Sequence, residues 1–167
     1  MITLKEIAGY LPYGLKVIYT GNGKPFKGTK RIEELTIQNL ELMLFLNKRA
    51  PLFHPLSDLI KPCLDGGKIP IVEMLKICYK NIYNYYPEIK CTSFFGEDLS
   101  FEVIAYDEDR ERMLFIWDVH MTSFAFCVNG NAMFINQLQL FDWLYEHHFD
   151  LHNLIGENLA IDINSIK

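Results

Sequence analysis

The residues best suited to chemistry in this sequence are the histidines and the aspartate near its C-terminus. His148 and His152 are four residues apart, so a continuous helix would place both on one face. This spacing is typical of metal ligation in the H-E-x-x-H motif, but Phe149 stands where the glutamate base would be. Asp150 joins the set only if the helix breaks near Phe149. A metal site made of His148, Asp150 and His152 is therefore one hypothesis, and helix-end histidines beside the C-terminal dipole are the other.

Two further groups have residue types suited to hydrolysis. Asp118 and His120 stand two residues apart on a predicted strand, so their side chains point to the same side. This arrangement suits a general base and the carboxylate that orients it, but no Ser or Cys nearby is placed as a nucleophile. Glu88-Ile-Lys90, with Asp65 upstream, has the layout of some metal-dependent nucleases, in which carboxylates hold magnesium and the lysine steadies the phosphate. Such short patterns arise often by chance. We predict no catalytic residues.

A cluster of aromatic side chains around residues 79–95 is the strongest candidate for recognition. Tyrosine is enriched at interfaces, because its ring is apolar while its hydroxyl can form hydrogen bonds. The alternative is that these rings belong to the core and its ordinary rim. We predict a protein-binding patch that contains Tyr83, Tyr85, Tyr86, Phe94 and Phe95.

The composition is that of a folded domain. The chain has 167 residues, of which 50% are hydrophobic, and this is enough for a packed core and argues against disorder. The net charge of −5 offers no general attraction for phosphate, so a nucleic-acid binder is disfavoured. The basic run from Lys24 to Arg31 lacks the spacing of a phosphate-binding loop. We predict a single globular domain, residues 1–167, without a cofactor.

The cysteines and the N-terminal residues indicate a reducing compartment. Cys63, Cys78, Cys91 and Cys127 form no C-x-x-C pair, and we expect buried free thiols. The N-terminus shows no secretory signal, and no apolar run approaches the roughly 20 residues needed to span a bilayer. We predict a cytoplasmic protein that does not enter a membrane.

The first half of the sequence predicts a capped helix, strands and an irregular connector. Thr3 and Glu6 have the spacing of a capping box, and Leu4 begins the apolar face of a helix that ends before Pro12. Strands are predicted over residues 15–19, 31–37 and 41–46, although the last stretch fits a helix equally well. The stretch 51–67 is rich in proline and glycine and predicts a connector.

The second half predicts a helix, a β-meander and a further helix. The pattern from Pro70 to about Tyr85 is helical. Strands at 101–106, 112–117, 123–128 and 132–135 follow, with Asn129-Gly130 as a tight turn. A helix begins at the cap Asn136 and buries a face that includes Leu138. Residues 159–163 form a last strand or an extended tail.

Several blocks of the sequence together resemble one group of small proteins. The blocks are residues 3–7 and 11–17, His54-Pro-Leu-Ser-Asp-Leu59, and residues 140–150 with 159–164. They resemble proteins without a known activity from the genomes of Bacteroides-type gut bacteria and their phages or prophages. The resemblance implies an origin in a mobile element, and it brings no reaction, cofactor or catalytic residue with it.

These observations predict an α+β fold in which an antiparallel sheet packs against two or three helices. For function, we expect a small phage-type accessory protein that acts without catalysis by binding another protein or a second copy of itself. A metal-dependent hydrolase or nuclease is the alternative. Nucleic acid is the less favoured partner.

Overall fold

The computed structural model describes residues 2–19, 32–36, 49–78, 88–94, 98–106, 112–118 and 123–166. The chain divides into two compact units. The first unit combines residues 1–56 with residues 142–167, and the second contains residues 57–141. The prediction of a single domain stays a prediction. The predicted strand at 41–46 lies outside the described residues.

The first unit begins with the predicted capping box. The Glu6 carboxylate accepts hydrogen bonds from the Thr3 amide (2.6 Å) and the Thr3 hydroxyl (2.8 Å), and α1 (Leu4–Ile7) starts behind this cap. The helix then tightens into the 3₁₀ helix η1 (Ala8–Tyr13), which contains Pro12. The expectation that Pro12 ends the helix is therefore wrong, and Gly14 ends it with a φ of 71°. Proline has no amide hydrogen, so Pro12 removes only one hydrogen bond from this short 3₁₀ helix.

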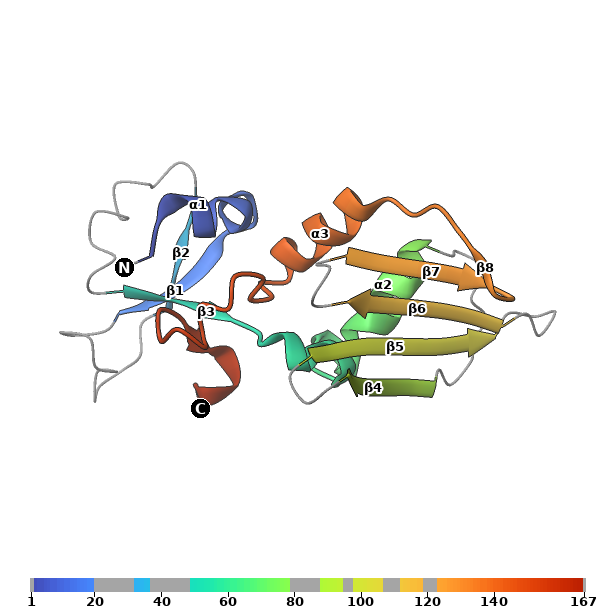
Figure 1. The fold of residues 1–167 in the computed structure, drawn as a ribbon. Coiled ribbons are helices and arrows are strands. Elements are labelled where there is room, and N and C mark those ends of the chain that lie inside the picture. Colours follow the sequence, from blue (N-terminus) through green and yellow to red (C-terminus); the bar gives the residue numbers. More distant parts are fainter. Residues whose placement is uncertain are drawn as a thin grey trace. The chain divides into compact units, whose positions relative to one another are not determined.

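The sheet of the first unit joins both ends of the chain. Its order is β2 (Ile32–Leu35), β1 (Leu15–Tyr19), β3 (Arg49–Phe53) and β9 (Ile161–Asp162). The pairs β1–β2 and β1–β3 are antiparallel (Figure 1), whereas β9 adds parallel to β3. Strand β3 runs through Pro51, so the predicted connector begins only after Phe53. A short 3₁₀ helix, η6 (Ile163–Ser165), follows β9.

The core of this unit is built around Tyr10. Its ring lies 4.5 Å from that of Phe53 and 4.8 Å from that of Tyr145, measured between centroids. The Tyr10 hydroxyl donates to the Phe149 carbonyl (2.7 Å) and accepts from the Leu151 amide (3.0 Å). A buried hydroxyl with both roles satisfied ties the C-terminal segment to the N-terminal helix. The other buried residues of the cluster around Tyr10 and Phe53 are Ile7, Leu11, Leu15, Val17, Leu35, Leu154 and Ala160.

The second unit is a β-meander crossed by a helix. The helix α2 (Pro70–Cys78) follows two 3₁₀ helices, η4 (Leu56–Ile60) and η5 (Asp65–Gly67). The five-stranded antiparallel sheet has the order β4 (Glu88–Phe94), β5 (Asp98–Tyr106), β6 (Arg112–Asp118), β7 (Ser123–Val128) and β8 (Asn131–Ala132). Figure 1 shows α2 running behind this sheet, and α2 contacts β5. The sequence patterns missed β4.

One face of the five-stranded sheet carries the core of the second unit. Val103 on β5 and alternate residues on β6 and β7 are buried, together with four residues of α2. Trp117 and Phe124 lie 4.4 Å apart between ring centroids, and Phe141 meets both edge-to-face. The buried set comprises Pro70, Ile71, Met74, Leu75, Val103, Met113, Phe115, Trp117, Phe124 and Phe126.

The last helix, α3 (Gln137–Glu146), starts where the sequence predicts. The Asn136 side chain accepts the Gln139 amide at 3.3 Å as a cap. The buried face contains Leu140 and Leu144, whereas Leu138 is exposed. The expectation that Leu138 lies on the buried face is wrong, because the stripe that faces the core is one residue out of phase with it.

The α+β class and the packing of helices on an antiparallel sheet are confirmed. The Asn129-Gly130 turn is confirmed too, with both residues at positive φ (49° and 81°) as a tight hairpin turn of this type requires. Among the described residues, no helix combines the length and the apolar composition needed to cross a membrane.

Candidate functional site

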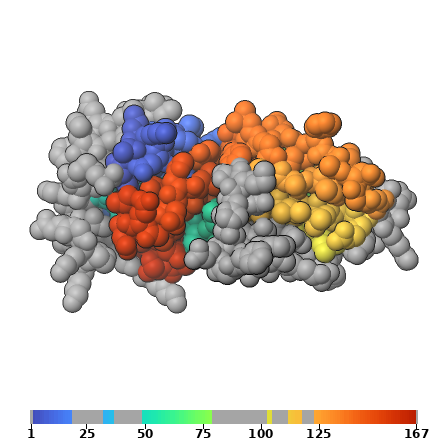
Figure 2. Space-filling model, viewed as in Figure 1, coloured from blue at the N-terminus to red at the C-terminus, as the bar shows by residue number. Residues whose placement is uncertain are grey.

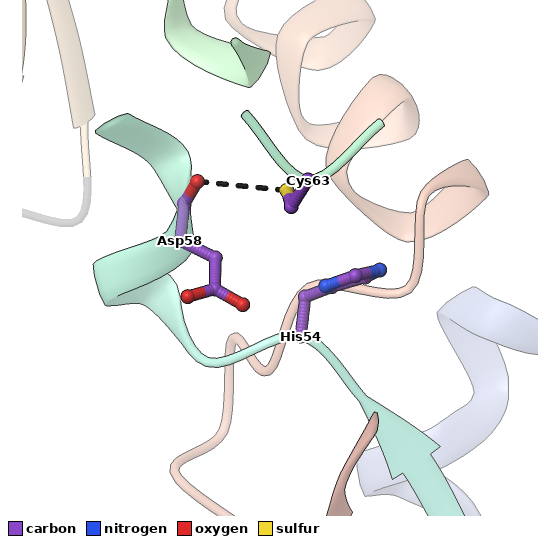
Figure 3. Close-up of side chains that lie close together, drawn as sticks. All are labelled: His54, Asp58 and Cys63. Carbon is purple, nitrogen blue, oxygen red and sulfur yellow. Dashed lines mark hydrogen bonds between the residues drawn. The ribbon is translucent and has the colours of Figure 1, made fainter. Parts of the chain in front are cut away.

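The described residues contain one group of side chains with the composition of a metal centre. His54, Asp58 and Cys63 each direct a potential ligand atom to a common region, and these atoms lie within 4.8 Å of one another. All three come from one continuous stretch, residues 54–63, so local chain geometry sets their proximity. Figure 3 shows the three side chains around this stretch.

The local fold explains how this stretch holds its shape. His54 follows β3, and its amide donates to the His148 carbonyl (2.8 Å) while its carbonyl accepts the Asp150 amide (2.9 Å). Asp58 lies on the 3₁₀ helix η4. Pro55 and Pro62 follow His54 and precede Cys63, and each fixes one backbone angle. The backbone carrying the three side chains is therefore largely set before any ligand binds.

The charges in this stretch centre on Asp58. Its carboxylate is almost fully buried, and the Lys61 ammonium lies 2.8 Å from one of its oxygens. The Cys63 thiol donates to the Asp58 main-chain oxygen at 3.6 Å (Figure 3). Burial, with a smaller contribution from the Asp58 charge, raises the pKa of Cys63 to about 11. The thiol is thus protonated at neutral pH.

Sequence patterns did not reveal this group. His54 and Asp58 belong to the block that carries the resemblance, and Cys63 was expected only to be a buried thiol; it is half-buried and free. The spacing H-x-x-x-D-x-x-x-x-C matches no standard ligand motif. The one signal was the pair of flanking prolines, because it indicates a rigid stretch that holds chemically useful side chains.

The predicted metal residues are placed differently from the expected helix face. Helix α3 ends at Glu146, and His148 has a φ of 55°, so His148 and His152 do not share a continuous helix. The Asp150 carboxylate accepts the Leu154 amide (2.9 Å) and the Ile155 amide (2.7 Å) and so caps a turn. These three residues lie close together along the chain of the first unit. Among the described residues, however, they do not form a group of ligand atoms close enough to hold a metal ion. Their metal binding stays a prediction.

His148 itself is a buried neutral base. Its Nε2 atom has no hydrogen-bond partner in the structure, and the side chain is 8% exposed. Burial, with smaller contributions from the charges of Lys16, His54 and His147, lowers its pKa to about 4. A hydrogen bond to the Tyr13 main chain opposes this shift only weakly. His148 is therefore uncharged in the fold at neutral pH.

The other predicted catalytic groups are not assembled within the described residues. Asp118 ends β6, and His120 lies outside the described residues. Glu88 and Lys90 do lie on a strand, β4, as a nuclease site would need, and Asp65 is exposed on η5. The basic run from 24 to 31 lies outside the described residues.

The predicted aromatic patch falls almost entirely outside the described part of the chain. Phe94 ends β4. The remaining members, Tyr83, Tyr85, Tyr86 and Phe95, lie in the undescribed stretches on either side of β4. The patch therefore stays a prediction.

The described residues show a different apolar surface, between β8 and α3. Phe134 is fully exposed (107%), and the nearby Leu138 (69%) and Met133 (49%) are exposed as well. We call this stretch the Met133–Leu138 segment. Figure 2 shows that the chain from residue 123 onward, in orange, contributes broadly to the visible surface of the second unit. Sequence patterns missed this surface, because they assigned Leu138 to the core.

A glutamine closes the edge of the sheet beside this segment. The Gln137 side chain accepts the Phe124 amide at 2.9 Å and donates to the Phe124 carbonyl at 2.6 Å. The Met133 amide donates to the Phe126 carbonyl at 2.8 Å. These contacts occupy the positions on β7 that a further strand would use, so this edge is protected against strand addition.

Comparisons with known proteins leave the chain without an assigned relative. No protein-family model matches it, and neither the curated proteins nor the solved structures provided a match.

Proposed function

We propose that this protein acts without catalysis, by binding another protein through the Met133–Leu138 segment. The single observation that supports this role is the fully exposed ring of Phe134 between two other exposed apolar side chains. Scattered apolar residues are common on protein surfaces, but large ones gathered in a short stretch mark interaction sites.

The absence of charge around the segment supports a protein partner. Residues 123–141, which include β7, β8 and the start of α3, contain no Asp, Glu, Lys or Arg, although these types make up 22% of the chain. The centres of protein interfaces are depleted in charged residues and enriched in aromatic residues and methionine. Nucleic acid would instead require lysine or arginine to contact phosphate.

The closed sheet edge defines the manner of recognition. Because Gln137 and Met133 occupy the hydrogen-bonding positions of β7, a partner would not add a strand at this edge. Recognition is therefore through side chains, with the Phe134 ring entering an apolar pocket of the partner. Two copies of the chain each carry a net charge of −5 and repel one another, so the favoured partner is a different protein.

The cellular setting follows from the sequence resemblance alone. It supports an accessory protein of a phage or prophage that works in the bacterial cytoplasm. The partner would then be a protein of the host or of the same mobile element.

Site-specific photocrosslinking tests this proposal in the host cell. A photoreactive phenylalanine analogue at position 134 should crosslink one defined protein, whereas the same residue at Leu4, an exposed position on the first unit, should not. The crosslinked protein is then purified, and its affinity for the unmodified chain is measured. A crosslink only to a second copy of the chain would instead establish self-association, and one to nucleic acid would favour the nuclease alternative.

Matched substitutions measure the contribution of the segment to binding. Truncating a central interface aromatic typically costs about 2 kcal/mol or more, so Phe134→Ser should weaken binding of the purified partner by about 30-fold. Leu138→Ser should weaken it as well, whereas Leu4→Ser, an exposed leucine on α1, should leave it unchanged. Equal effects of Leu138→Ser and Leu4→Ser would refute the assignment of this surface.

A further inference from the structure

We propose that His54, Asp58 and Cys63 form a binding site for a borderline-soft divalent cation, with Zn²⁺ as the best match. This site goes beyond the protein-binding role and is independent of it, because it contains no residue of the Met133–Leu138 segment.

The combination of ligand atoms selects the class of metal. The group offers one imidazole nitrogen, one carboxylate oxygen and one cysteine sulfur. A thiolate disfavours the hard cations Mg²⁺ and Ca²⁺, which prefer oxygen ligands, while nitrogen and sulfur together suit Zn²⁺. Three protein ligands leave the fourth tetrahedral position for water, as in open zinc sites.

The distances are close to those of a formed site. Zn²⁺ lies about 2.0 Å from nitrogen or oxygen and about 2.3 Å from sulfur, so tetrahedral ligand atoms are about 3.5 Å apart. The three atoms lie within 4.8 Å of one another. Each therefore needs to approach the ion by about 1 Å, which side-chain rotation supplies without movement of the backbone.

The backbone that holds the ligands is already ordered. Both main-chain groups of His54 are hydrogen-bonded, to residues 148 and 150, and the His54 ring lies 5.4 Å from the ring of Phe149. Asp58 is carried on η4, and the Lys61 amide donates to its carbonyl at 3.0 Å. Ordered ligands lose less conformational entropy when an ion binds.

The charges balance when the ion enters. Zn²⁺ accepts a lone pair from each ligand, the S–H bond of Cys63 breaks, and its proton passes to the buffer. The Lys61 ammonium, whose side chain is 57% exposed, leaves the Asp58 carboxylate for water. One thiolate and one carboxylate then neutralise the two charges of the ion. Binding should consequently release a proton and strengthen as the pH rises.

The experiment uses the full chain, freed of metal with a chelator under reducing conditions. Zn²⁺ is titrated in competition with a chromophoric chelator, and Co²⁺ serves as a spectroscopic probe of sulfur ligation. We expect one ion per chain, a sulfur-to-cobalt charge-transfer band and release of a proton. Excess Mg²⁺ should not compete, and thermal melting should shift upward with Zn²⁺.

Substitutions identify the ligands, with circular dichroism to verify folding. Cys63→Ala, His54→Ala and Asp58→Asn should each weaken Zn²⁺ binding by about 100-fold or more, since loss of even an outer-shell partner costs about 10–100-fold. Cys78→Ala, which removes a half-buried thiol on α2, should bind as the wild type does. Phe134→Ser should also bind Zn²⁺ normally, which separates this site from the protein-binding surface.

Two results would overturn the proposal. One is the absence of saturable binding at one ion per chain in the folded wild type. The other is a Cys63→Ala variant that keeps both its Zn²⁺ affinity and the cobalt charge-transfer band.

Discussion

The buried neutral imidazole of His148 should make the stability of the fold depend on pH. An unfolded histidine has a pKa of 6.5, whereas burial lowers that of His148 to about 4. Between these two values the unfolded chain binds a proton that the folded chain excludes. The free energy of unfolding therefore falls as the pH drops through this window, and it is unaffected by His148 above about pH 7.

The size of this effect follows from the two pKa values. Proton linkage with 6.5 for the unfolded chain and about 4 for the folded one gives a loss of about 2.5 kcal/mol between pH 7.5 and pH 4.5. This corresponds to a change of about 70-fold in the unfolding equilibrium. The loss is large compared with the total stability of a typical domain.

Chemical denaturation followed by circular dichroism at a series of pH values measures this dependence. Other groups contribute to the pH profile of the wild type, so the comparison with His148→Asn isolates the imidazole. Asparagine suits this position because it tolerates the φ of 55° found there. The variant should be less stable at pH 7.5 but should lose about 2.5 kcal/mol less than the wild type on acidification.

His147→Asn is the matched control, because it removes the neighbouring histidine and keeps His148. It should retain most of the dependence on pH, because burial is the largest cause of the lowered pKa of His148. If the wild type and His148→Asn lose the same free energy between pH 7.5 and pH 4.5, His148 is not a buried neutral base and the reasoning fails.

Three further predictions concern packing and hydrogen bonding. A Cβ atom on Gly9 would lie 2.6 Å from the Tyr145 ring, so Gly9→Ala should destabilise the fold by about 1–3 kcal/mol, and Tyr145→Leu should restore part of this loss in a double-mutant cycle. Tyr10→Phe leaves two main-chain groups without their hydrogen-bond partner, so it should lower the free energy of unfolding by about 1–3 kcal/mol in chemical denaturation. An unchanged free energy of unfolding would contradict the role of the hydroxyl. Gln137→Ala should also lower the free energy of unfolding by about 1–3 kcal/mol. Because it opens the edge of β7, it should in addition increase light scattering on storage. Gln139→Ala is the control and should have neither effect.

Local signals predicted those elements whose cause lies within a few residues. The Thr3–Glu6 capping box, the Asn129-Gly130 turn and the Asn136 cap all appear where their side chains indicate. Strands β1 and β7 have their predicted bounds, because alternating apolar residues suffice to define a half-buried strand.

Predictions failed where distant residues determine the outcome. Leu138 has helical spacing with buried residues, but it faces solvent because the core meets α3 along Leu140 and Leu144. Whether His148 and His152 share a continuous helix was left open by their spacing; the chain leaves the helix at Glu146, and the C-terminal segment is held by Tyr10, far away in sequence. Neither change has a local signature.

The sequence by itself determined the class of fold, the positions of caps and turns, and the net acidic charge, because these depend on composition and on neighbours along the chain. Only the tertiary structure revealed that Phe134 is exposed and that His54, Asp58 and Cys63 converge. Exposure and convergence depend on where the chain folds back on itself, and that is decided by the sum of many weak packing contacts rather than by any short motif.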